Sequence, residues 1–208
     1  MIGKGTLAFD SPHRRGATLV RQARIGPRQR VLDASLYGRI GHGTVFLALL
    51  AKRACPEAAV SGTYGDARML VRARREISAA GLSVEVREGQ PWAPGLDPRS
   101  FDRILSSLLF HHLPTAEKRR TLEVFHGLLV PGGELHVVDW VRPQSPILAM
   151  LFLGVRMSDG FRNTSDHVSG RFPCLMKEAG FATVEELRRE IAIPGRLGFY
   201  RATKSGED

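Results

Sequence analysis

Short apolar runs alternate along the chain with longer stretches of helical periodicity. Runs typical of strands lie at 30–34, 58–62, 83–87, 101–107, 134–140, 183–188 and 197–203. Helical stretches lie at 45–54, 66–80, 115–129 and 166–179, and a glycine (Gly81, Gly132 or Gly180) follows three of them. Because glycine adopts the left-handed cap conformation without steric cost, these glycines indicate where three of the helices end. The alternation predicts a doubly wound α/β fold with a seven-stranded, mostly parallel sheet and helices on both faces.

The size and composition fit a single globular domain. The chain has 208 residues, of which 43% are hydrophobic, and this is enough to bury a core without help. Cys55 and Cys174 lie far apart, in no metal-ligand spacing, so we expect two inert thiols in a reducing compartment and no metal site. We find neither the apolar segment of a secretory signal nor a run long enough to span a bilayer, and we therefore expect a cytoplasmic protein.

The formal net charge of +9 is concentrated at the N-terminus. The first 30 residues hold seven basic side chains and one acidic one, a net charge of +6. We predict a basic arm or helix at 1–27, followed by the main domain at 28–208. Such an arm could attract nucleic acid or an anionic membrane surface. However, no interleaved aromatic residues and no nucleic-acid motif accompany it, which favours a solvated face. Peripheral membrane contact and oligomer formation stay open.

Ligands of a doubly wound sheet bind at the carboxyl ends of its strands, near the switch in strand order. Polar residues follow each of the first five predicted strands, and they form the set of candidate site residues. In chain order these are Asp33, Gly41, Gly43, Tyr64, Asp66, Gln90, Ser106, His111, His112 and Asp139.

Five segments resemble, in order and spacing, those of the class I S-adenosylmethionine-dependent methyltransferases. They are "VLDA…GHGT…LALLAKR", "VSGTYGDARML", "EGQPWAPGLDPRSFDRILSSLLFHHLP", "LLVPGGELHVVDW" and "LMKEAGFATVEE". The greatest likeness is to the branch that includes the ubiquinone and menaquinone biosynthesis C-methyltransferases, and it covers residues 28–203. The resemblance implies a Rossmann-like fold, S-adenosylmethionine as cofactor and a small-molecule acceptor. It also implies that the cofactor is held by Asp33, Gly41, Gly43, Tyr64, Asp66, Gln90 and Ser106.

Three positions depart from the family pattern. Residues 35–40 separate the first strand from the glycine loop, and Val45 stands where the last loop glycine would fall. Tyr64 stands at the acidic position that accepts hydrogen bonds from the ribose hydroxyls, and a neutral phenol cannot replace a carboxylate there. Asp66 either takes over that contact or caps the following helix, and capping is the favoured alternative. Gln90 replaces an aspartate but can still accept from the adenine amino group. These changes predict weaker cofactor binding.

The candidate catalytic residues are His111 and His112. A carbon or phenol acceptor must lose a proton, and histidine titrates near neutral pH. Packing under the loop or capping of the next helix is the alternative role for either of them. Asp139 either orients such a base or simply ends its strand.

The segment 146–155, "PILAMLFLGV", is apolar on all sides when drawn as a helix. Such a helix is buried in the core or an interface, or it meets an apolar ligand. The resemblance implies a lid over the acceptor here, and an apolar lid suits a hydrophobic substrate. We therefore predict methyl transfer from S-adenosylmethionine to a small hydrophobic acceptor. The alternative is a catalytically impaired methyltransferase fold that serves as a binding or scaffold partner.

Overall fold

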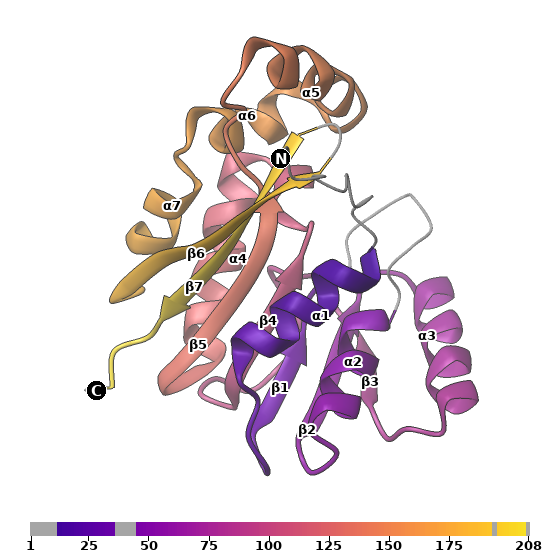
Figure 1. Cartoon of the computed structure of the whole chain (residues 1–208). Helices are drawn as coiled ribbons and strands as arrows, with labels where there is room; N and C mark the ends of the chain where they lie inside the picture. Colours follow the sequence, from indigo (N-terminus) through magenta and orange to yellow (C-terminus); the bar gives the residue numbers. More distant parts are fainter. Residues whose placement is uncertain (1–11, 36–44, 193–194, 207–208) are drawn as a thin grey trace, which may run out of the picture.

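The computed structural model describes residues 12–35, 45–192 and 195–206, and its centre is a seven-stranded sheet (Figure 1). The strands are β1 (Arg30–Asp33), β2 (Ala59–Tyr64), β3 (Glu85–Glu88), β4 (Phe101–Ser107), β5 (Leu129–Trp140), β6 (Thr183–Ala192) and β7 (Gly195–Thr203). Their order is β3-β2-β1-β4-β5-β7-β6. The first five pair in parallel, and β7 runs antiparallel to both β5 and β6. The predicted doubly wound, mostly parallel α/β fold is confirmed.

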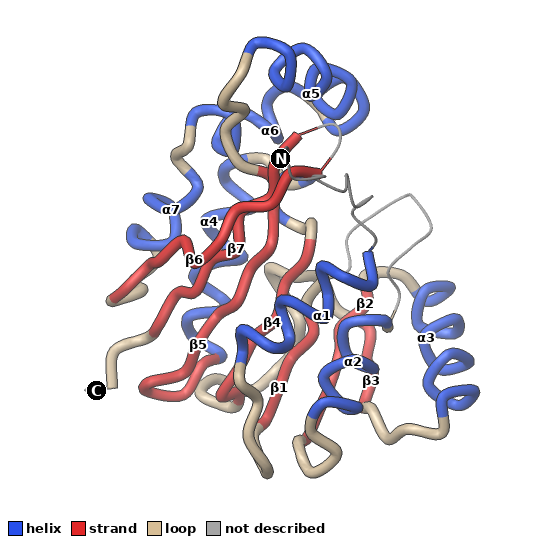
Figure 2. Tube along the Cα trace, in the orientation of Figure 1, coloured by secondary structure: helices blue, strands red, loops and turns tan. Residues whose placement is uncertain are grey.

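Helices cover both faces of the sheet (Figures 1 and 2). One buried cluster joins the sheet to α1 (Pro12–Ala23), α2 (Phe46–Ala54) and α3 (Ala67–Ala80). A second cluster joins the opposite face to α4 (Thr115–Leu128) and α7 (Phe172–Glu178). Two further helices, α5 (Pro146–Asp159) and α6 (Phe161–Ser169), lie beyond the carboxyl ends of β4 and β5, at the top of Figure 1. In the described residues, none of the helices has the length and apolarity needed to cross a membrane.

The first helix packs its apolar side against the sheet and leaves basic side chains exposed. Leu19 and Ala23 are buried, whereas Arg14 and Arg21 are exposed. Gln22 fastens the helix to the sheet, because its Nε2 donates to the Tyr200 carbonyl at 2.9 Å. The same Nε2 lies 3.1 Å from Nδ1 of His136. The part of the basic N-terminus that the structure describes is therefore a docked helix.

One predicted helix is wrong. The stretch 166–179 is divided between α6 and α7, because Gly170 adopts a positive φ of 77° and caps the end of α6. Pro173 then lies in the first turn of α7, where its missing N–H is tolerated. The expected loop at Pro131–Gly133 instead lies within β5, which begins at Leu129.

Candidate active site

Asp33 joins the end of β1 to the helix that follows it. Its buried carboxylate accepts from the Ala48 N–H through Oδ2 at 2.8 Å and from the Ser35 N–H through Oδ1 at 2.9 Å. Burial raises the pKa of Asp33, and the hydrogen bonds from Ser35 and Ala48 oppose this. Asp33 thus fixes the start of the predicted cofactor loop, whereas Gly41 and Gly43 lie outside the described residues.

At the end of β2, Tyr64 and Asp66 have different surroundings. Tyr64 is fully buried, and its hydroxyl has no hydrogen-bond partner among the described residues. Burial raises the pKa of Tyr64, and so do the charges of Asp33 and Glu76. Asp66 Oδ1 accepts from the Arg68 N–H at 2.6 Å and caps α3. The predicted capping role of Asp66 is therefore confirmed, and its contact with the cofactor stays a prediction, as does that of Tyr64.

Gln90, just past β3, and Ser106, near the end of β4, offer hydrogen-bonding atoms. Gln90 Nε2 donates to the Gly65 carbonyl at 3.0 Å, which leaves its buried Oε1 without a partner in the described part of the chain. The same holds for the fully buried hydroxyl of Ser106. Buried polar atoms without partners are rare in folded proteins. These atoms fit a polar ligand at the carboxyl edge, and Gln90 Oε1 can accept from an amino group such as that of adenine.

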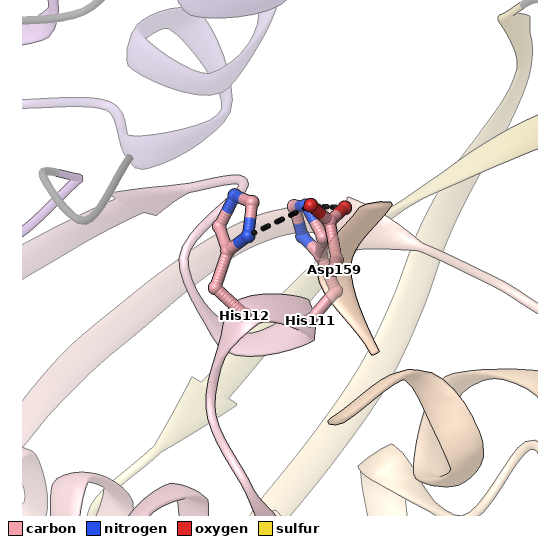
Figure 3. Close-up of side chains that lie close together, drawn as sticks. All are labelled: His111, His112 and Asp159. Carbon is pink, nitrogen blue, oxygen red and sulfur yellow. Dashed lines mark ion pairs between the residues drawn. The ribbon is translucent and has the colours of Figure 1, made fainter. Parts of the chain in front are cut away.

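Three side chains from two elements meet beside this edge (Figure 3). The short helix η1 (Phe110–His112) follows β4 and carries His111 and His112, whose ring centroids are 3.9 Å apart. Asp159, the last residue of α5, faces both rings. Its Oδ2 lies 3.6 Å from Nε2 of His111, and its Oδ1 lies 3.5 Å from Nδ1 of His112. We call these three residues the His-Asp cluster.

Asp139, near the end of β5, holds His111 in place. Its Oδ1 lies 2.7 Å from Nδ1 of His111, and its Oδ2 accepts from the Phe110 N–H at 2.8 Å. Burial raises the pKa of Asp139, but the charges of His111 and His167 and the hydrogen bonds outweigh it and leave the pKa well below its usual range. Because a carboxylate only accepts, Nδ1 of His111 carries a hydrogen, and Nε2 is the ring nitrogen that faces Asp159.

Helix α6 supports the cluster from the other side. The Asn163 amide donates to the backbone carbonyls of both His112 and Asp159, each at 2.9 Å. His167 donates from Nδ1 to the Trp140 carbonyl at 2.9 Å, and its buried Nε2 has no partner among the described residues. Burial lowers the pKa of His167 to about 4, so the ring is neutral at pH 7. Burial, and then the charge of His111, also lowers the pKa of His112.

Sequence reasoning placed His111, His112 and Asp139 near one another, and the structure brings all three together. Their roles in catalysis stay predictions. It missed Asp159, which ends an apolar helix in a distant part of the chain and has no motif around it. It left Asn163 and His167 without roles, because the predicted helix boundaries hid their position on one short helix.

The known proteins that this chain resembles are methyltransferases. Residues 39–133 match a family described as a methyltransferase domain. An uncharacterized methyltransferase of Synechocystis is 28% identical over 182 residues, which cover 86% of this chain and 77% of the relative. A ubiquinone/menaquinone biosynthesis C-methyltransferase of Syntrophotalea carbinolica is 27% identical over 86% of this chain and 79% of its own. Residues 39–133 thus match a methyltransferase domain, and the chain is similar over most of its length to curated methyltransferases.

The fold of the methyltransferase agrees with that of a solved relative. The apo structure of the S-adenosylmethionine-dependent methyltransferase SibL superposes with a TM-score of 0.71 at 21% identity, over 91% of this chain and 54% of that one. A second solved structure, titled "PigF with SAH", has the same fold, with a TM-score of 0.68 at 17% identity over 89% of this chain and 53% of that one. The matched segment contains Tyr64, Gln90 and Ser106 as well as both histidines of the His-Asp cluster.

Proposed function

We propose that the methyltransferase transfers the methyl group of S-adenosylmethionine to a small apolar acceptor that binds between α5 and the His-Asp cluster. The observation that carries this proposal is the composition of α5. This helix presents apolar side chains along its length, and its last residue, Asp159, belongs to the cluster. An apolar surface therefore leads directly to the groups that can act on a proton.

Helix α5 buries little of its apolar surface against the rest of the protein. Among its described residues only Phe152 is buried, and it packs edge-on against Trp140. Ile147 is 68% exposed, Met150 67% and Met157 72%. The expected alternative of burial in the core does not account for these side chains. Exposed apolar patches commonly mark ligand or partner sites, and here Met157 precedes Asp159 by two residues in the same helix.

The reaction requires the protein to align the methyl donor with the acceptor and to take one proton from the acceptor. When bound, S-adenosylmethionine supplies a methyl group on a positively charged sulfur, and most of the acceleration comes from holding the reactants aligned and dry. The acceptor must present an electron pair. His111 can free this pair by taking a proton from the acceptor oxygen or carbon onto Nε2, because Asp139 keeps the other nitrogen protonated. The electron pair then forms the new bond to the methyl carbon, and the thioether leaves.

The residues available to the cofactor lie at the neighbouring strand ends. Gln90 Oε1 would accept from the adenine amino group, and the Ser106 hydroxyl lies at the end of β4, the strand that leads into the two histidines. Asp33 would shape the loop between β1 and α2. The relative named for ubiquinone/menaquinone biosynthesis is a C-methyltransferase, which supports an apolar ring as the class of acceptor.

The first test is calorimetric titration of the purified protein with S-adenosylmethionine and with S-adenosylhomocysteine. We expect saturable binding of both. Methyl transfer from labelled cofactor is then measured over a panel of apolar phenols and quinols, with His111→Gln as the test variant. The control is His126→Gln, which changes a histidine on the last turn of α4. Absence of cofactor binding would favour the binding or scaffold role, and transfer only to polar acceptors would refute the proposed substrate class.

A further inference from the structure

We propose that His111, His112 and Asp159 bind a divalent metal ion. Each contributes one ligand atom, and in the structure these atoms all lie within 4.8 Å of one another. They come from η1 and from the end of α5, and Figure 3 shows the carboxylate turned toward both rings. Two imidazoles and one carboxylate are a common ligand set for a transition-metal ion.

The spacing of the three side chains supports a shared ion. The separations of 3.6 Å and 3.5 Å between the Asp159 oxygens and the ring nitrogens are longer than good hydrogen bonds. Zinc binds nitrogen and oxygen ligands at about 2.0–2.2 Å in tetrahedral geometry, which places neighbouring ligand atoms about 3.4 Å apart. Each separation is close to that between two ligands of one ion, and the two rings face different oxygens of Asp159.

The surroundings of His111 support the same conclusion. Its Nδ1 lies 2.7 Å from the Asp139 carboxylate and so carries a hydrogen, and Nε2 is the ring nitrogen turned toward Asp159. Histidines that bind metals almost always donate their other ring N–H to a carboxylate, a carbonyl or water. Carboxylates on both sides of this ring favour a positive charge between them, which either a proton on Nε2 or a bound cation supplies. Asp139 is thus a positioning residue for the proposed site.

The types of ligand and their exposure restrict which metal ions could bind and in what kind of site. Mg²⁺ and Ca²⁺ prefer oxygen ligands, whereas imidazole suits Zn²⁺, Fe²⁺ and Co²⁺. The His112 side chain is 26% exposed and that of Asp159 15%, so the cluster is open on one side. Three protein ligands with a fourth position open are typical of catalytic sites rather than structural ones.

What the ion would do rests on the proposed function, whereas the ion site itself rests on the geometry alone. The open position would take an oxygen of the acceptor. The positive charge of the ion would lower the pKa of that oxygen, so that its proton passes to water and its electron pair becomes available. With an ion bound, Nε2 of His111 is a ligand and no longer a base. The acceptor class then becomes a phenol, catechol or enol.

The test measures ion binding without cofactor or acceptor, so its failure is distinct from failure of the proposed function. The full chain, without a histidine tag and stripped by a chelator, is titrated with Co²⁺ and followed by visible absorption. Zn²⁺ is then added in competition. We expect one Co²⁺ per chain, displaced by Zn²⁺, and a higher melting temperature with Zn²⁺ present.

Two variants and one control decide where the ion binds. Asp159→Asn and His112→Gln change partly exposed side chains, and each should weaken Co²⁺ binding at least about tenfold, as loss of a ligand does. His126→Gln keeps full affinity, because His126 contacts Phe181 at the other end of α4. Absence of saturable binding by the folded wild type would overturn the proposal, and so would equal affinity in all three variants.

Discussion

The ion pair between Lys118 on α4 and Asp166 on α6 holds the helix that supports the His-Asp cluster, and it yields a quantitative prediction. Lys118 Nζ lies 2.9 Å from Asp166 Oδ2 and also donates to the Asn163 carbonyl. Thr115 donates to the same carboxylate oxygen at 2.8 Å. The Lys118 side chain is fully buried, and that of Asp166 is 6% exposed. Replacing Lys118 by methionine keeps the volume and removes the charge.

The expected loss of stability follows from what the variant leaves behind. At an effective dielectric constant of about 20, two unit charges about 3 Å apart attract by about 6 kcal/mol. Taking both charges out of water costs several kcal/mol each, so the intact pair is close to neutral for stability. Lys118→Met leaves Asp166 charged and without its partner, and should lower the free energy of unfolding by about 3–5 kcal/mol. In the wild type, burial raises the pKa of Asp166, but the hydrogen bonds from Lys118 and Thr115 outweigh it and lower the pKa. In Lys118→Met the hydrogen bond from Thr115 still favours the ionised carboxylate.

Urea unfolding followed by circular dichroism measures this effect. Adding Asp166→Asn to Lys118→Met removes the unpaired charge, so the double variant should be more stable than Lys118→Met alone, by at least about 1 kcal/mol. The matched control is Arg119→Met, on the same helix, which breaks an exposed pair with Glu178 and should cost less than about 1 kcal/mol. A loss in Lys118→Met no larger than in Arg119→Met would refute this reasoning.

Three further predictions concern other parts of the molecule. Gln90→Leu should weaken binding of S-adenosylmethionine about tenfold in calorimetry, because it removes the acceptor Oε1. The hydrogen bond from His136 lowers the pKa of Glu134 in the folded protein, against the effect of burial. The ionised Glu134 side chain therefore stabilises the fold above the pKa that it has in the unfolded chain. This stabilisation is lost as the pH falls through the lower pKa of the folded state. Urea unfolding should therefore show less loss of stability in Glu134→Gln than in wild type between about pH 5 and pH 3. Phe152→Ala should lower the free energy of unfolding by about 3–5 kcal/mol, whereas Met157→Ala, at a side chain 72% exposed, should change it by less than about 0.5 kcal/mol.

The sequence predicted the strands well and some of their ends poorly. The run 101–107 coincides with β4, because a buried parallel strand is marked by its own apolar residues. β6 extends to Ala192, well past the predicted end at residue 188. Its length depends on antiparallel pairing with β7, and its side chains are mostly exposed, so no local apolar pattern marks the end. Such a strand end is set by pairing with a distant segment of the chain, and the local sequence pattern carries no information about that pairing.

Residues of the site were predictable where the fold rule for strand ends applies. His111 and His112 follow a buried strand, and that position together with their chemistry singled them out. Asp159 completes the cluster from the end of α5, and His167 packs on Phe172 at 4.7 Å from within α6. In the sequence, neither residue directly follows a strand of the parallel sheet. The positions of Asp159 and His167 in the site depend on how α5 and α6 cross the edge of the sheet. The periodicity of the sequence does not predict this arrangement.

The two halves of the site differ in how far the protein satisfies its own polar groups. Asp139 accepts from three backbone N–H groups and one ring nitrogen, so the half beside the acceptor is fixed before any ligand arrives. On the cofactor side, Tyr64, Gln90 and Ser106 each keep a buried polar atom without a partner among the described residues. Each such atom costs about 1–3 kcal/mol. A polar ligand at this edge would supply partners for such atoms. On the histidine side, Nε2 of His167 is likewise without a partner among the described residues, whereas Asp139 holds His111 through contacts within the fold.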